Sequence, residues 1–229
     1  MGGEKDTEPP KLIVASPELF TTNFTLGEFT LEFDELFNLD NIYKQLIISP
    51  PLENKPIIKV NKNNLIVSFK DEHLLPATTY TFNFGDAIKD NNEGNILKNF
   101  SYVFSTGTYI DSMNISGKIV DAYTKEPLED VSVMLYSSLE DSMPLTSSPN
   151  YLDKTDEEGN YSIANIKNGV YQIFALQDLN ANYIFDQPAE LLGFFNGPID
   201  ILPDHPSIYN LPLFQEDNTI QFVKQIIDK

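Results

Sequence analysis

Residues 115–186 contain the pattern that decides the fold of this chain. They begin Ile-Ser-Gly-Lys-Ile-Val-Asp-Ala (residues 115–122), where apolar and polar residues alternate as in a half-buried β-strand that runs into a turn. A second run, Glu-Asp-Val-Ser-Val-Met-Leu-Tyr, occupies residues 129–136. Residues 155–163, Thr-Asp-Glu-Glu-Gly-Asn-Tyr-Ser-Ile, form an acidic turn that leads into a third run. The spacing predicts three strands separated by turns.

The end of this stretch adds a tight turn and a polar loop. Residues 166–175 place Asn168-Gly169 between two apolar runs, which is the strongest short-range signal of a β-hairpin. Residues 178–186, Asp-Leu-Asn-Ala-Asn-Tyr-Ile-Phe-Asp, are rich in side-chain oxygen atoms. We therefore predict a hairpin at Asn168-Gly169 and an oxygen-rich loop after its second strand.

Taken in order, these strands and turns resemble the carboxypeptidase-regulatory-like, or transthyretin-like, β-sandwich module, which is also close to the Cna-B repeat. The resemblance implies an architecture and no particular chemistry. The Ser- and Pro-rich residues 137–150 are predicted to form a loop within the module. Apolar pieces split by prolines, at residues 191–195, 199–202 and 209–214, are expected to add edge strands.

The residues before this module also have a β pattern. Apolar and polar residues alternate over residues 29–33, and Tyr80, Phe82 and Phe84 share one face of another predicted strand. We interpret these three rings as core. Residues 42–48 are compatible with either a helical turn or a strand. Turns recur about every ten residues and long helical periodicity is absent, which indicates a β-sandwich.

Residues 8–107 resemble the SbsA-like, or Big-5, bacterial Ig-like domain. The resemblance rests on the order of several short marks rather than on any one of them. These marks are Pro9-Pro10, Ser16-Pro17, Phe33-Asp34-Glu35, the Leu-Pro-Ala-Thr-Thr-Tyr corner at residues 75–80, the loop that ends in Gly94-Asn95, and Phe104-Ser105-Thr106-Gly107.

We therefore predict an all-β chain with two tandem β-sandwich domains. Residues 1–10 are expected to be a flexible leader. Residues 11–108 are expected to form the Ig-like β-sandwich, and residues 113–229 the carboxypeptidase-regulatory-like β-sandwich with a C-terminal extension. The connection at residues 109–114 is short, so the two domains should dock or tilt within a narrow range.

Acidic side chains dominate the composition of the 229 residues. The 34 Asp and Glu residues exceed 15 basic residues, all of them Lys, so the formal net charge is −19. This charge argues against nucleic acid and against bare anionic membranes as partners. The absence of Arg removes the usual bidentate clamp for phosphate or carboxylate ligands. Because the chain has no Cys, it forms neither a disulfide nor a thiolate metal site.

The first residues suggest a cellular location. Residues 2–10, Gly-Gly-Glu-Lys-Asp-Thr-Glu-Pro-Pro, resemble the leader of a group of Bacteroidota outer-membrane lipoproteins that place an Ig-like domain before a regulatory-like module. The resemblance implies a lipid-modified Cys directly before Gly2, a periplasmic or surface-exposed position, and membrane contact only through that anchor, which this chain lacks. We therefore expect the native gene to encode a signal peptide and this Cys. Envelope proteins are the expected partners.

Familiar catalytic motifs are absent from the sequence. It lacks Gly-x-Ser-x-Gly, His-Glu-x-x-His, Walker A and Rossmann glycine patterns, and neither His73 nor His205 has a helix-spaced partner for a metal. The Asp-Glu pairs at residues 34–35 and 71–72 would point to opposite faces of a strand, so they do not converge for glycosidase chemistry. We predict a non-catalytic envelope lipoprotein with a structural or protein-binding role through its sheet edges and loops.

Two alternatives stay open at this stage. A carbohydrate-binding surface module needs exposed flat rings, and the chain has 16 Phe and 11 Tyr but no Trp. An exposed Tyr pair on a concave face would favour this alternative, and an apolar or aromatic patch across the domain junction would favour a protein partner. A hydrolase would need a buried His205 that is hydrogen-bonded to both a carboxylate and a Ser.

The oxygen-rich loop is the candidate metal site. Asp178, Asn180 and Asn182 follow the Asp-x-Asn-x-Asn start of an EF-hand-like loop, and Asp186 stands at its ninth place. Together with the backbone carbonyl of Ile184, these side chains would bind Ca²⁺. Since only two of the four side chains are charged, we expect a dissociation constant of about 10⁻⁴–10⁻³ M.

The loop departs from the full calcium motif at two positions. Tyr183 stands where Gly is expected, and Glu190 falls one residue late. The alternative interpretation is an Asx-rich turn that is stabilised by its own side chains.

Overall fold

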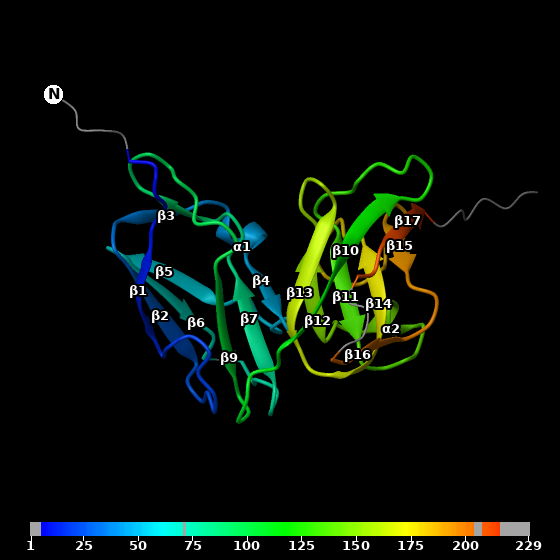
Figure 1. Cartoon of the computed structure of the whole chain (residues 1–229), viewed down its shortest axis with the longest axis horizontal. Coiled ribbons are helices and arrows are strands. Elements are labelled where there is room, and N and C mark those ends of the chain that lie inside the picture. The colour runs from blue at the N-terminus through cyan, green and yellow to red at the C-terminus, as the bar shows by residue number, and fades with distance from the viewer. Residues whose placement is uncertain (1–5, 71, 204–207, 216–229) are drawn as a thin grey trace, which may run out of the picture.

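Strands account for most of the regular structure of this chain. The computed structural model describes residues 6–70, 72–203 and 208–215. In these residues, the only helices are two single turns, α1 (Ile42–Gln45) and α2 (Met143–Thr146). The remaining elements form two β lobes that lie side by side (Figure 1). The prediction of an all-β fold with β-sandwich domains is confirmed.

The first lobe is built from antiparallel strands. One sheet has the order β1-β2-β6-β5, a second has the order β4-β7-β9, and β3 pairs with β8. The strands are β1 (Leu12–Ser16), β2 (Glu28–Phe33), β3 (Phe37–Leu39), β4 (Ile47–Ser49), β5 (Ile57–Asn61), β6 (Asn64–Ser68), β7 (Thr79–Asn83), β8 (Ile88–Asp90) and β9 (Ser101–Ser105).

Aromatic rings fill the space between these sheets. The Phe29 and Tyr102 rings stack with their centroids 3.9 Å apart, so they join β2 to β9. Tyr80, Phe82 and Phe84 are all buried, which confirms their interpretation as core. Because alternate residues of a strand share a face, the period-2 pattern brings these rings to one interface. The lobe is therefore stabilised mainly by burial of aromatic surface.

The second lobe forms one long strand path with the order β12-β11-β14-β15-β17-β10-β13, and β16 adds to β14. Neighbours on this path are antiparallel except β10 and β17, which are parallel. The strands are β10 (Met113–Asp121), β11 (Ser132–Tyr136), β12 (Tyr151–Lys154), β13 (Asn160–Ile166), β14 (Gly169–Leu176), β15 (Leu191–Phe194), β16 (Ile199–Ile201) and β17 (Leu211–Gln215).

The two ends of this path meet, so the lobe is almost closed. The backbone N–H of Ser162 on β13 donates to Oδ2 of Asp153 on β12, at 2.9 Å.

On β11, Val133 faces the enclosed core, whereas Met134 belongs to a second apolar cluster on the outer face. Met143 of α2 is among the side chains that cover this outer cluster. Strand β11 is thus buried on both faces.

The predicted hairpin at Asn168-Gly169 is wrong. These residues connect β13 to β14, but β13 pairs with β10, whereas β14 pairs with β11, β15 and β16. Neither residue adopts the positive φ that a two-residue hairpin turn of type I′ requires, and Asn165 takes it instead, at 57°. The Tyr171 hydroxyl donates to the Lys167 carbonyl at 2.8 Å and stabilises the crossing. The segment therefore passes from β13, at one end of the strand path, to β14 in its interior.

Some shorter elements also differ from expectation. The ambiguous residues 42–48 divide into α1 and the start of β4. The predicted loop at residues 137–150 contains α2, and β12 follows it without having been predicted. The predicted domain boundaries stay a prediction, and residues 216–229 of the C-terminal extension lie outside the described residues.

Candidate functional site

The residues considered for catalysis do not assemble into a site in the described part of the chain. His73 is exposed. Its neighbour Glu72 accepts hydrogen bonds from the backbone N–H groups of Glu53 and Asn54 at 3.0 and 2.9 Å, so this carboxylate stabilises a loop. His205, together with Asp71 of the second carboxylate pair, lies outside the described residues.

The other carboxylate pair belongs to an acidic loop region with a structural role. Asp34 accepts a hydrogen bond from the backbone N–H of Lys11 at 2.8 Å and thereby fixes the start of β1. Burial raises the pKa of Glu35, and the charges of Asp90 and Asp34 raise it further. Burial also acts to raise the pKa of Asp90, but four backbone N–H groups donate to its carboxylate and lower the pKa to about 2. Asp90 therefore organises the turn that follows β8.

The structure brings together the side chains of the predicted calcium loop. Asp178 accepts from the backbone N–H groups of Asn182 at 3.3 Å and Tyr183 at 2.7 Å. The side-chain amides of Asn180 and Asn182 donate to the two oxygens of Asp186, at 3.2 and 2.9 Å. These contacts have the form of an Asx-rich turn, in which carboxylates accept from nearby amides.

Both departures from the calcium motif have a structural explanation. Tyr183 adopts φ of 60° at the position where Gly is expected, and its ring packs against the outer apolar cluster of the second lobe. Burial raises the pKa of this tyrosine. Glu190 is fully buried, and its carboxylate accepts from the backbone N–H groups of Leu179, Asp186 and Gln187. The loop therefore folds over the sheet as a cover.

Calcium binding by this loop stays a prediction. Within the described residues, no group of three or more His, Asp or Glu side chains is placed to hold a metal ion. The predicted set contains only two carboxylates, Asp178 and Asp186, and both already accept hydrogen bonds from amides. A bound Ca²⁺ would have to replace these bonds with oxygen ligands.

A buried pair of side chains holds the linker against the first lobe. The hydroxyl of Thr79 on β7 donates to Oδ2 of Asp111 at 2.8 Å, and the backbone N–H of Asp111 donates back to Thr79 Oγ1 at 2.9 Å. Thr79 is 1% exposed and Asp111 is 7% exposed. Because an unpaired buried carboxylate is costly, this reciprocal pair fixes where the linker leaves the first lobe.

Further contacts join the outer face of the β4-β7-β9 sheet to the edges of the second lobe. The backbone N–H of Leu152 on β12 donates to the Ser49 hydroxyl at 3.1 Å. The side-chain amide of Asn165 on β13 donates to the Thr81 hydroxyl at 2.9 Å. Ile47 of β4 packs against the outer apolar cluster of the second lobe. The two lobes are thus docked along β12 and β13.

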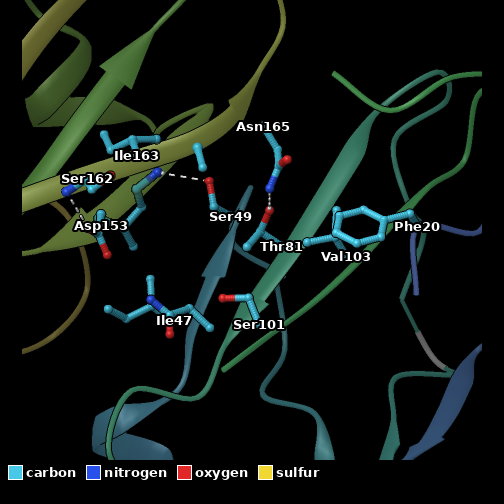
Figure 2. A pocket seen from close by; sticks show the side chains of 13 residues that line it. Phe20, Ile47, Ser49, Thr81, Ser101, Val103, Asp153, Ser162, Ile163 and Asn165 are labelled. Atoms are coloured by element: carbon cyan, nitrogen blue, oxygen red, sulfur yellow. Dashed lines mark hydrogen bonds between the residues drawn. The ribbon is translucent and has the colours of Figure 1, made fainter. Parts of the chain in front are cut away.

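A cleft of about 270 Å³ lies along this junction (Figure 2). Its lining from the first lobe comes from the segment before β2 and from β4, β7 and β9, and its lining from the second lobe comes from β12 and β13. The lining residues are Phe20, Ile47, Ser49, Thr81, Asn83, Ser101, Val103, Leu152, Asp153, Ser162, Ile163, Ala164 and Asn165.

Asp153 is the ionisable residue of this lining. Burial raises the pKa of its carboxyl to about 6, although hydrogen bonds from the backbone N–H groups of Ser162 and Lys154 act to lower it. The charge of Asp156 raises the pKa further. Sequence reasoning missed this cleft, because its walls come from strands that are far apart in the chain.

The first lobe matches a known family. Residues 6–106 match the family model of the bacterial Ig-like domain. No curated protein matches the chain. This match shows an Ig-like domain in the first lobe.

Solved structures that the comparison finds similar to this chain include several pilins. The major pilin subunit BcpA of Bacillus cereus is 12% identical, with 90% of this chain and 71% of that chain covered and a TM-score of 0.28. The pilus 2b backbone protein of group B streptococcus is 12% identical, with 87% and 89% covered and a TM-score of 0.26. A streptococcal ancillary pilin is 13% identical, with 68% and 49% covered and a TM-score of 0.27.

The calcium prediction can be tested by thermal unfolding. If the loop binds Ca²⁺, millimolar calcium should raise the melting temperature relative to a chelator, because a ligand that binds only the folded state stabilises it by mass action. Asp178→Ala should remove this calcium response. A wild-type midpoint that does not move, or a variant that responds equally, would show that residues 178–186 form only an Asx-rich turn.

Proposed function

We propose that this protein is the docked two-domain part of a non-catalytic envelope lipoprotein, which acts as a structural or protein-binding module at the outer membrane or cell surface. The observation that carries the proposal is the docked junction, where Leu152 and Asn165 of the second lobe donate hydrogen bonds to Ser49 and Thr81 of the first. Two hydrogen bonds between Thr79 and Asp111 also fix the linker to the first lobe. Two domains held at a fixed angle suit a spacer or a scaffold, because such a protein must keep a fixed distance and orientation between its two ends. The Ig-like match supports a module of this class.

Exposed sheet edges of the first lobe suit protein partners. Strands β1 and β5 are the outer strands of their sheet. On β1, the side chains of Ile13 and Val14 are 59% and 49% exposed, and on β5, Ile57 is 56% exposed. An extended segment of a partner protein can add to such an edge through main-chain hydrogen bonds. Lys59, which is also exposed on β5, disfavours unselective pairing between edges.

The proposed location rests on the leader. Residues 2–10 resemble the leader of lipoproteins whose modified Cys precedes the first Gly. None of the helices in the described residues is long and apolar enough to span a membrane. We therefore propose that a lipid anchor attaches the native protein to the outer membrane, and that its partners are other envelope proteins.

The carbohydrate-binding alternative is less well supported by the exposed rings. Among the described residues, Phe194 and Phe214 are the ring pair in which both members are exposed, at 50% and 42%. Their planes meet at 78°, so they do not form a flat platform for a sugar ring. They also lie on β15 and β17, on the side of the second lobe away from the first (Figure 1). This pair of rings is therefore neither an exposed Tyr pair on a concave face, as a sugar-binding module would need, nor a patch across the domain junction.

Thr79→Val tests the rigid junction. Valine has nearly the shape of threonine but leaves the buried Asp111 carboxylate without its hydroxyl donor, which should cost about 1–3 kcal/mol of stability. Calorimetry should show one cooperative transition for the wild-type chain, and a lower melting temperature with two separated transitions for the variant. Thr30→Val, on the outward face of β2, is the matched control and should behave like the wild type. Separate domain transitions in the wild type would contradict the proposal.

A test in cells addresses the envelope role itself. The full native protein should label with palmitate, fractionate with the outer membrane and be recovered with envelope proteins after cross-linking. Changing the Cys expected before Gly2 to Ala should abolish the labelling and release the protein from the membrane fraction. A cytosolic protein without lipid would overturn the proposed location.

A further inference from the structure

The interdomain cleft has room for a small chemical group, and its walls come from both lobes. Its volume of about 270 Å³ exists only because the lobes are docked, since each lobe supplies one wall. Figure 2 shows Asp153 and Ser162 on the second-lobe side and Thr81 and Ser101 on the first-lobe side. Pockets for small ligands are often found at domain interfaces of this kind.

The lining of the cleft contains one acidic side chain, Asp153, and no basic side chain. Asp153 faces a lining in which β4, β7, β9 and β13 contribute only apolar side chains, hydroxyls and amides. Lys154, next to it on β12, pairs with Asp130 at 2.6 Å. The neighbouring charge that acts on Asp153 is that of Asp156, which is also negative. Asp153 is half-buried, and a carboxylate that is partly removed from water and lacks a cationic partner is costly. A ligand that supplied the positive charge would offset this cost.

We propose that this cleft binds an organic primary ammonium group, with Asp153 as its counter-ion. An ammonium group has three N–H donors and no acceptor, and the carboxylate of Asp153 and the hydroxyls of Ser101 and Ser162 are acceptors of the required kind. Ile47 and Val103 offer apolar surface to the alkyl chain that carries the ammonium. Anionic ligands are disfavoured, because the lining has no cation and the chain has a net charge of −19.

The ammonium can come from two sources that share this chemistry, a free alkylamine or the side chain of a lysine on a partner protein. The cleft does not depend on the proposed envelope role, and failure of one proposal leaves the other standing. Binding should depend on pH, because Asp153 pairs with a cation only when it is ionised. The affinity should therefore rise as the pH increases through about 6, where the carboxyl loses its proton.

The experiment is an NMR titration of the ¹⁵N-labelled chain with n-butylammonium chloride, with 1-butanol as the neutral control of equal shape. We expect saturable shifts of the backbone amides of Ser162, Ala164 and Asn165 with the amine only. Asp153→Asn keeps an acceptor for the Ser162 N–H and should weaken binding about tenfold or more, because the charge of the pair is lost. Asp156→Asn is the matched control and should change the affinity less than about twofold, because this exposed charge is screened by solvent.

Equal shifts with butanol, unchanged affinity in Asp153→Asn, or no shifts at all would overturn the proposal. Saturable shifts with a monosaccharide and none with the amine would also overturn it, in favour of a sugar site. A tripeptide with a central lysine and its Nε-acetylated form distinguish the sources. Tighter binding of the unmodified peptide than of butylammonium would assign the site to a partner lysine, and weaker binding would assign it to a free amine.

Discussion

The hydrogen bonds between Thr79 and Asp111 are the contact on which the arrangement of this molecule depends. Asp111 lies in the short linker, and its side chain is buried beside Thr79 of β7. A buried polar group is tolerated only when its hydrogen-bonding capacity is used, so the linker is held where Thr79 can donate. Beyond the linker, β12 and β13 lie against the β4-β7-β9 sheet. The Ser49–Leu152 and Asn165–Thr81 contacts follow from this docking.

The docking also covers two strands that end the second strand path. Strands β12 and β13 are the two ends of the second strand path, and an uncovered edge presents N–H groups that can pair with another chain. The Ser49 hydroxyl accepts a hydrogen bond from the backbone N–H of Leu152, and the Asp153 carboxylate accepts one from the backbone N–H of Ser162. The edges are thus satisfied by side chains rather than by another strand. The remaining space between them becomes the cleft, so the cleft and the covered edges have the same origin.

Local patterns in the sequence predict much of this fold but little of the junction. Alternation along β2 and β7 predicts both the strands and the aromatic core, because side-chain direction in a strand follows directly from position. The Asn168-Gly169 signal predicts a hairpin that does not form, because the residues of a turn do not determine which strands pair. In the folded chain β13 pairs with β10, whereas β14 pairs with β11. Thr79 and Asp111 are 32 residues apart and belong to no motif. Their pairing, like the lining of the cleft, depends on how two finished lobes meet.

The measurement that tests the fixed junction most directly is the distance distribution between two spin labels, one in each lobe. The chain contains no Cys, so Lys59→Cys on β5 and Tyr123→Cys after β10 introduce label sites without further changes. Both positions are exposed, with Tyr123 94% exposed, so the labels should not disturb packing. Pulsed electron paramagnetic resonance should give a single narrow distribution if the lobes form one rigid body. A broad distribution, or one with several maxima, would contradict the account.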